Sequence, residues 1–146
     1  MNSSEDVAQT RSTLFDRLGG AAAIDHLVET FYKQMDSLPD AAALRALHAP
    51  DLGPTKADLK RYLSEWTGGP ALYSPQKGHP RMRARHMHVP IGEAERDAWL
   101  ECMRTALAVA VADGPARLEL YANMAKLADW MRNQPGNPHD ARRATG

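Results

Sequence analysis

Cysteine is nearly missing from this chain of 146 residues, because Cys102 is the only one. An internal disulfide is therefore impossible, and a zinc module built from several cysteines is excluded. Long hydrophobic runs are missing too: the longest, Ala106–Ala112, spans seven residues, whereas a helix that crosses a membrane needs about 18. The first six residues are polar and lack the apolar stretch of a secretory signal. We therefore expect a cytoplasmic protein with no membrane partner.

An excess of charge of either sign is also missing. Eighteen lysines and arginines balance 18 aspartates and glutamates, so the formal net charge is zero. A protein that binds nucleic acid through its overall charge carries a clear basic excess. The balance predicts that nucleic acid is not a partner.

β-Branched aliphatic residues are scarce, with five valines and two isoleucines against 24 alanines and 15 leucines. Valine and isoleucine favour strands, whereas alanine and leucine favour helices. The composition therefore predicts an all-α protein, and the length is that of one domain. We place this domain at residues 12–133, between polar tails at 1–11 and 134–146 that we expect to be flexible.

Apolar residues recur at helical spacing in four longer segments, which predicts four main helices. Their apolar positions are Ile24, Leu27, Val28, Phe31, Tyr32 and Met35 in the first; Leu59, Tyr62, Leu63 and Trp66 in the second; Trp99, Cys102, Met103, Ala106, Leu107 and Ala110 in the third, which spans 93–112; and Leu118, Tyr121, Ala125, Ala128 and Met131 in the fourth, which spans 116–133. Shorter helical pieces are expected at 14–18, after Pro39, and at 81–87.

Capping and stop signals bound these helices. Ser12 or Thr13 can cap the first short piece, and Gly19 can end it in the left-handed conformation. Thr55 is expected to cap the second main helix. Between Gly68 and Pro80, three glycines and three prolines in 13 residues predict an irregular stretch. A loop of this length in a small helical domain is often functional.

Several common catalytic motifs are absent, including a Walker-type loop, Gly-x-Gly-x-x-Gly, His-Glu-x-x-His and Gly-x-Ser-x-Gly. No Glu-x-x-His pair lies on the long helices, which argues against a carboxylate di-iron bundle. Cys102 could act as a nucleophile, but its place on an apolar stripe favours a buried hydrophobic role. We therefore assign no catalytic residue.

The segment from His79 to His88 concentrates three histidines and three arginines within ten residues. It is compatible with a solvated basic helix. A zinc site would need more thiolate or carboxylate partners nearby, whereas a haem site needs one proximal imidazole. Arginine would also pair well with haem propionates. Tyr32 and Trp99, on stripes of two helices, are either core aromatics or hydrogen-bond donors in a pocket.

Taken together, these segments resemble the group II truncated haemoglobins over roughly residues 14–131. The matching segments are Leu14-Phe15-Asp16-Arg17-Leu18-Gly19-Gly20, Phe31-Tyr32, Gly68-Gly69-Pro70-x-x-Tyr73-Ser74, Gly78-His79-Pro80-Arg81-Met82-Arg83-Ala84-Arg85-His86, and Glu95-Arg96-Asp97-Ala98-Trp99-Leu100-Glu101-Cys102-Met103. The resemblance implies a shortened globin, a two-over-two helical sandwich around one haem b. The apoprotein is then expected to lose stability, because a ligand that binds only the folded state stabilises it.

The resemblance also assigns roles to individual residues. It implies that His86 is the proximal iron ligand. It implies a distal pocket that binds the small ligand, formed by Tyr32, His48, Trp99, Thr55 and Leu59. Contacts with the cofactor are implied for Phe31, Tyr73, His79, Met82, Arg85 and Met103, with Tyr73 and Arg85 near the propionates.

This chain departs from the family pattern in two places. His88-Val89 stands where the family commonly has Pro-Phe, and Thr67 replaces an aromatic residue before the glycine pair. His88 is a second imidazole two residues from the implied ligand. Residues two apart on a helix do not share a face, so both cannot approach the iron together.

Three functions follow from this pattern. The first is reversible binding of dioxygen and similar diatomics, for storage or scavenging, by a monomer or homodimer that an unidentified reductase serves. The second is a haem redox enzyme, either peroxidase-like or removing nitric oxide, in which His48 and Tyr32 move protons. The third is a helical interaction domain without a cofactor.

Overall fold

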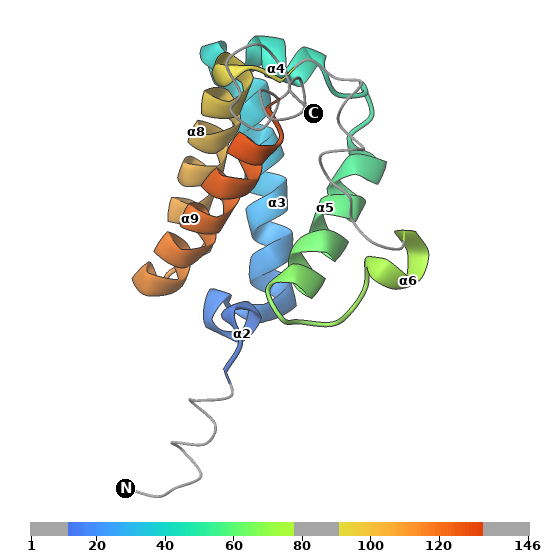
Figure 1. The fold of residues 1–146 in the computed structure, drawn as a ribbon, viewed down its shortest axis with the longest axis vertical. Helices are drawn as coiled ribbons and strands as arrows, with labels where there is room; N and C mark the ends of the chain where they lie inside the picture. Colours follow the sequence, from blue (N-terminus) through green and yellow to red (C-terminus); the bar gives the residue numbers. More distant parts are fainter. Residues whose placement is uncertain (1–11, 78–90, 133–146) are drawn as a thin grey trace, which may run out of the picture.

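The computed structural model describes residues 12–77 and 91–132, and every regular element in these two ranges is a helix. The predicted all-α class is therefore confirmed (Figure 1). The elements are α2 (Leu14–Leu18), α3 (Gly20–Ser37), the 3-10 helix η1 (Pro39–Ala41), α4 (Ala42–Ala46), α5 (Gly53–Trp66), α6 (Ser74–Lys77), α8 (Glu93–Ala110) and α9 (Gly114–Trp130). In this part of the chain, no helix has the length and apolarity that a bilayer crossing needs.

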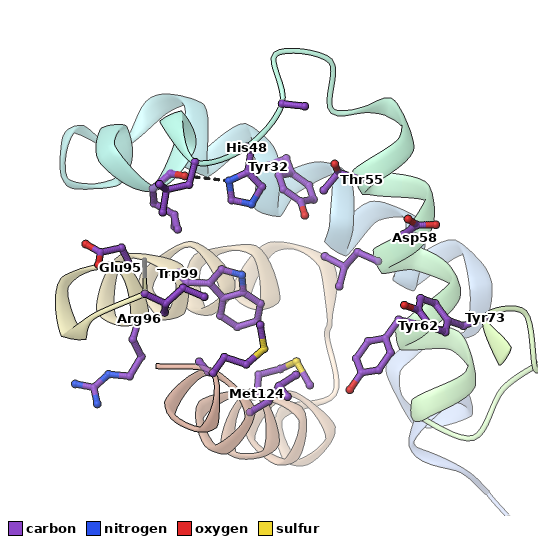
Figure 2. Close-up of a pocket in the computed structure, with 18 residues that line it drawn as sticks. Tyr32, His48, Thr55, Asp58, Tyr62, Tyr73, Glu95, Arg96, Trp99 and Met124 are labelled. Carbon is purple, nitrogen blue, oxygen red and sulfur yellow. Dashed lines mark hydrogen bonds between the residues drawn. The ribbon is translucent and has the colours of Figure 1, made fainter. Parts of the chain in front are cut away.

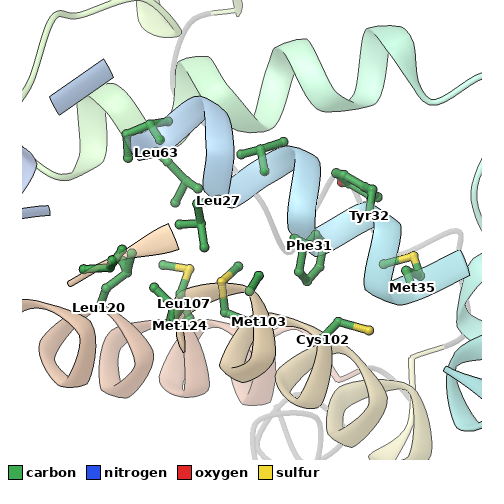
Figure 3. Close-up of a cluster of buried hydrophobic side chains, with 14 of the residues drawn as sticks. Leu27, Phe31, Tyr32, Met35, Leu63, Cys102, Met103, Leu107, Leu120 and Met124 are labelled. Atoms are coloured by element: carbon green, nitrogen blue, oxygen red, sulfur yellow. The ribbon is translucent and has the colours of Figure 1, made fainter. Parts of the chain in front are cut away.

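The four long helices form two layers of two. α3 packs against both α5 and α8, and α8 packs against α9. The core lies between α3 and the α8–α9 pair (Figure 3). Its largest fully buried side chains include Leu27, Phe31, Met103, Leu107 and Leu120. This arrangement is the predicted two-over-two sandwich.

The apolar stripe of α3 is confirmed in full, because all six of its predicted positions are buried. The stripe of α8 is confirmed as well: Cys102, Met103, Ala106 and Leu107 are buried, and Trp99 is partly buried against the core. Each buried leucine-sized side chain contributes about 1.5–3 kcal/mol relative to an exposed one. Among the described elements, α3 and α8 pack against each other more extensively than any other pair.

The corner between α2 and α3 also forms as predicted. The Thr13 hydroxyl accepts a hydrogen bond from the Asp16 amide, and the Asp16 carboxylate accepts one from the Thr13 amide, which makes a capping box. Gly19 ends α2 with φ of 114°, a conformation that costs a residue with a Cβ atom more than it costs glycine.

The glycine pair after α5 turns the chain tightly against α2. Gly68 has φ of +94°, and a Cβ atom on Gly69 would lie 2.5 Å from the ring of Phe15. The amide of Phe15 donates to the Thr67 carbonyl oxygen at 2.9 Å. The segment that leads to Tyr73 begins at this contact between the Gly69 backbone and the Phe15 ring.

Three local predictions were wrong. Thr55 does not cap α5, because the helix begins at Gly53 and Leu52 precedes it without a side-chain cap. Trp66 is 41 % exposed, and the buried residue at this end of α5 is Thr67, whose hydroxyl donates to the Leu63 carbonyl oxygen. On α9, Leu118 is 70 % exposed, whereas the buried positions are Ala116, Leu120 and Met124. The other predicted positions on this helix are partly buried, so packing turns the buried face of α9 away from Leu118 and toward Leu120.

Candidate ligand pocket

One cavity of about 400 Å³ opens between α4, α5, α8 and α9 (Figure 2). This volume lies within the range of about 300–1,000 Å³ typical of small-molecule sites. Six residues predicted for the site line it: Tyr32, His48, Thr55, Leu59, Tyr73 and Trp99. They come from α3, the end of α4, α5, the loop after α5, and α8. The fold thus brings together positions that are far apart in the sequence.

Tyr32 and Trp99 reach the pocket from two different layers and are linked by a core residue. The ring of Phe31 lies 4.9 Å from that of Tyr32 and 5.1 Å from that of Trp99, both edge to face. Such pairs are worth about 0.5–1.5 kcal/mol beyond their buried area. Phe31 therefore restrains the two side chains that flank it.

The hydroxyl of Tyr32 is a permanent hydrogen-bond donor in this setting. Its side chain is 4 % exposed, and burial raises the pKa of Tyr32 well above its ordinary value. Burial disfavours the charged phenolate. The hydroxyl consequently keeps its proton throughout the physiological pH range.

His48 has a defined tautomer. Its Nδ1 lies 2.9 Å from the Leu44 carbonyl oxygen, and a carbonyl oxygen only accepts, so Nδ1 carries the proton. In the neutral ring Nε2 is then an acceptor. The ring packs edge to face on Tyr32, with centroids 5.9 Å apart. In its neutral form the imidazole therefore offers an acceptor beside the donor hydroxyl of Tyr32.

A pair of tyrosines forms another part of the lining. Tyr62 on α5 and Tyr73 in the following loop pack edge to face with centroids 5.8 Å apart. Burial, with a smaller contribution from Tyr73, raises the pKa of Tyr62. The loop is tied to α5 because Glu65 accepts hydrogen bonds from the amide and hydroxyl of Ser74. These bonds hold the pKa of Glu65 below its usual value.

Two predicted cofactor contacts lie in the core rather than in the lining. Phe31 and Met103 are fully buried, and neither is among the residues that line the cavity. Cys102 is likewise fully buried, and burial raises the pKa of its thiol to about 11. A thiol with this pKa is a poor nucleophile, which supports the structural role expected for it.

The four remaining predicted site residues, His79, Met82, Arg85 and His86, lie outside the described residues, as does His88. Between 12–77 and 91–132, no group of three or more histidine, cysteine, aspartate or glutamate side chains is placed to hold a metal ion.

Sequence reasoning missed part of the lining. Tyr62 on α5 and Met124 and Leu127 on α9 line the cavity without having been predicted for the site. Ala128 and Met131, which also line it, belong to the predicted apolar stripe of the last helix. Tyr62 follows Leu59 by three residues on the same helix face, and this spacing was the available signal. Met124 and Leu127 lie off the predicted apolar stripe of α9, so that pattern does not indicate them.

The lining fits the group that the resemblance implies. Leucine, methionine and alanine side chains from α4, α5 and α9 make much of the wall apolar, while Tyr32, His48 and Trp99 supply polar groups. An apolar slot with a few convergent polar groups suits a flat, mostly apolar cofactor and a small polar ligand.

Comparison with known proteins agrees with this fit. A family model for bacterial-like globins matches residues 13–133. The group 2 truncated hemoglobin YjbI of Bacillus subtilis is 36 % identical over 115 residues, which are 79 % of this chain and 85 % of that protein.

Two solved structures share the fold at substantial identity. The group II 2-on-2 hemoglobin of Agrobacterium tumefaciens is 41 % identical with a TM-score of 0.82, covering 84 % of this chain and 95 % of that one. The truncated oxygen-avid haemoglobin of Bacillus subtilis is 34 % identical with a TM-score of 0.77, covering 84 % and 100 %. The chain therefore belongs to the bacterial-like globin family, as a haem-binding truncated haemoglobin of group II with the 2-on-2 fold.

Proposed function

We propose that this protein reversibly binds dioxygen and other small diatomic ligands at a haem b, with a storage or scavenging role. The observation that carries the proposal is the convergence of Tyr32, His48 and Trp99 on one largely apolar cavity. Haem supplies the iron to which the diatomic ligand binds. The side chains of the pocket then decide how long the ligand stays.

The Tyr32 hydroxyl and the Trp99 indole N–H are suited to donate hydrogen bonds to a small ligand that carries partial negative charge. Trp99 offers an N–H and no acceptor, so it cannot compete for the iron. A donor in a low-dielectric pocket is electrostatically stronger than the same donor in water. Two such donors favour slow release, which suits storage or scavenging better than delivery. The Bacillus subtilis relative described as oxygen-avid supports this choice.

The rest of the binding site follows from the resemblance. We propose that His86 ligates the iron, that Tyr73 and Arg85 contact the propionates, and that Thr55 and Leu59 complete the distal wall. His79 and Met82 would contact the cofactor directly. Phe31 and Met103, both buried in the core, would act through the residues packed on them. A cytoplasmic reductase partner and a monomeric or dimeric state complete the proposal.

The test is the rate of oxygen dissociation from the reduced, haem-loaded protein, measured by stopped flow. Trp99→Phe removes one donor and should speed oxygen loss roughly tenfold, the equivalent of a hydrogen bond of about 1.4 kcal/mol. Trp66→Phe is the matched control, since Trp66 is 41 % exposed and is not among the residues lining the cavity.

Two results would overturn the proposal. One is a folded protein that takes up no hemin. The other is rapid turnover of hydrogen peroxide with no stable binding of oxygen, which would favour the redox enzyme instead.

A further inference from the structure

An ionic network joins the start of α8 to the end of α9 beside the pocket. The Asp129 carboxylate accepts a hydrogen bond from Arg96 Nη1 at 2.8 Å and another from Arg132 Nε at 2.9 Å. Arg132 Nη1 also lies 3.5 Å from Glu93 Oε1. Asp129 is therefore the anion that connects a cation on α8 with a cation at the end of α9.

Among the ion pairs that join elements within 12–77 and 91–132, this network holds the least exposed side chain, that of Arg132. The side chain of Arg132 is 8 % exposed, and that of Arg96 is 23 % exposed. Burial alone would raise the pKa of Asp129, but its bonds to Arg96 and Arg132 outweigh burial and lower it. Removing one partner of a buried ion pair is strongly destabilising, and this applies here to Arg132. Asp129 itself is 38 % exposed, and Arg96 also pairs with Asp97 at 2.9 Å. The three charges therefore hold one another in place.

The network lies where the hydrophobic core between the two helices is thin. On α8 the first fully buried residue is Cys102, and on α9 the last is Met124. Beyond these positions the two helices line the cavity, with Trp99 on α8 and Met131 just after the end of α9. Trp99 and Leu127 are only partly buried there, and the ionic contacts add a link between the helices to this looser apolar packing.

Arg96 stands one helical turn before Trp99 on α8. Residues three apart on a helix are neighbours on one face. Both side chains belong to the cavity wall. Fixing Arg96 to α9 therefore fixes the turn of α8 from which the indole of Trp99 enters the pocket.

We propose that Asp129 is a positioning residue for the ligand pocket, which holds α8 against α9 through Arg96 and so keeps Trp99 directed at the bound ligand. The proposal rests on the proposed function for its effect on the ligand. Its structural part, that the Asp129–Arg96 contact holds α8 against α9, does not depend on which ligand is bound.

The test compares Asp129→Asn with Glu119→Gln in the full-length, haem-loaded protein. Glu119 lies on the same helix and pairs with Arg17 of α2 at 3.0 Å, away from the cavity. Backbone hydrogen exchange should become faster at 92–99 and 127–132 in Asp129→Asn and stay unchanged there in Glu119→Gln. Oxygen dissociation should speed up at least about twofold in Asp129→Asn alone, because residues without ligand contact modulate coupled sites by this much or more.

Two further variants separate positioning from general stability. Asp129→Glu keeps the charge and should restore most of the protection and the slow oxygen release. In a Trp99→Phe background, Asp129→Asn should add no further change in oxygen release, because residues that act through one another are not additive. If Asp129→Asn does not load haem, Arg96→Gln replaces it, since this variant leaves the Asp129–Arg132 pair intact.

The outcomes are distinct. If backbone hydrogen exchange at 92–99 and 127–132 is unchanged in Asp129→Asn, Asp129 does not hold α8 against α9. Faster exchange with additive effects of Asp129→Asn and Trp99→Phe overturns the action through Trp99. A haem-loaded protein that binds no oxygen overturns the proposed function, while the exchange data still show whether Asp129 holds α8 against α9.

Discussion

The rings of Phe31 and Trp99 meet edge to face across the contact between α3 and α8, with centroids 5.1 Å apart and planes 63° apart. Phe31 makes a second such contact with Tyr32 at 4.9 Å. A fully buried core residue thus supports two pocket residues from the side away from the cavity. Phe31 therefore joins the packed core to two residues that line the pocket.

Replacing Phe31 by leucine should change ligand release more than its cost in stability suggests. Phe31→Leu removes both ring contacts and should destabilise the fold by about 1–3 kcal/mol. Tyr32 and Trp99 then lose their common support, so oxygen dissociation should become several-fold faster. Urea unfolding and stopped-flow oxygen release measure the two effects.

Leu27→Ala provides the control for this variant. Leu27 is fully buried on the same helix and does not line the cavity, so its loss should cost about 2–5 kcal/mol with oxygen release unaltered. If both variants changed oxygen release in proportion to their stability, Phe31 would be an ordinary core residue.

The buried hydroxyl of Tyr32 predicts a loss of stability at high pH. The pKa of Tyr32 is raised in the folded state, whereas an unfolded tyrosine ionises near about pH 10. Above that pH the unfolded chain releases a proton that the folded protein keeps. The free energy of unfolding should therefore fall with a slope of up to about 1.4 kcal/mol per pH unit from this residue, and Tyr32→Phe should remove this contribution.

Unfolding in urea from neutral pH to about pH 11 tests this expectation. Tyr121→Phe is the matched control, because Tyr121 is only partly buried on α9 and does not line the cavity. Tyr62 keeps its own raised pKa in every variant, so some alkaline destabilisation should persist. Parallel curves for the parent protein and Tyr32→Phe would show that Tyr32 ionises equally easily in both states.

Local signals in the sequence were sufficient for part of this fold. The stripe of α3 has six large apolar residues at one spacing, and the corner at Thr13 and Gly19 depends on neighbours three residues apart, so both could be predicted. On α9, by contrast, alanines weaken the contrast between faces. Leu118 and Leu120 are two residues apart and compete for the interior, and only packing against α8 decides between them.

Part of the candidate site could likewise be predicted from the sequence, and part could not. Tyr32 and Trp99 were recognisable from stripe positions and from the family resemblance. The hydrogen bond from His48 to the Leu44 carbonyl oxygen depends on a side-chain rotamer, and the bridge between Asp129 and Arg96 joins two residues that are 33 positions apart in the sequence. Neither leaves a pattern in the sequence, because both arise only when the helices are packed.

The identity of the iron ligand can be tested between two neighbouring histidines. His86 and His88 are two residues apart, and in helical backbone they would point to different faces. We expect His86→Gly to lose the absorption spectrum of an iron with an axial imidazole and to regain it when free imidazole is added. His88→Gly should keep the parent spectrum. In the reverse result, His86→Gly keeps the imidazole spectrum and His88→Gly loses it. That result would assign the iron ligand to His88 and would shift the proposed register of the proximal side by two residues.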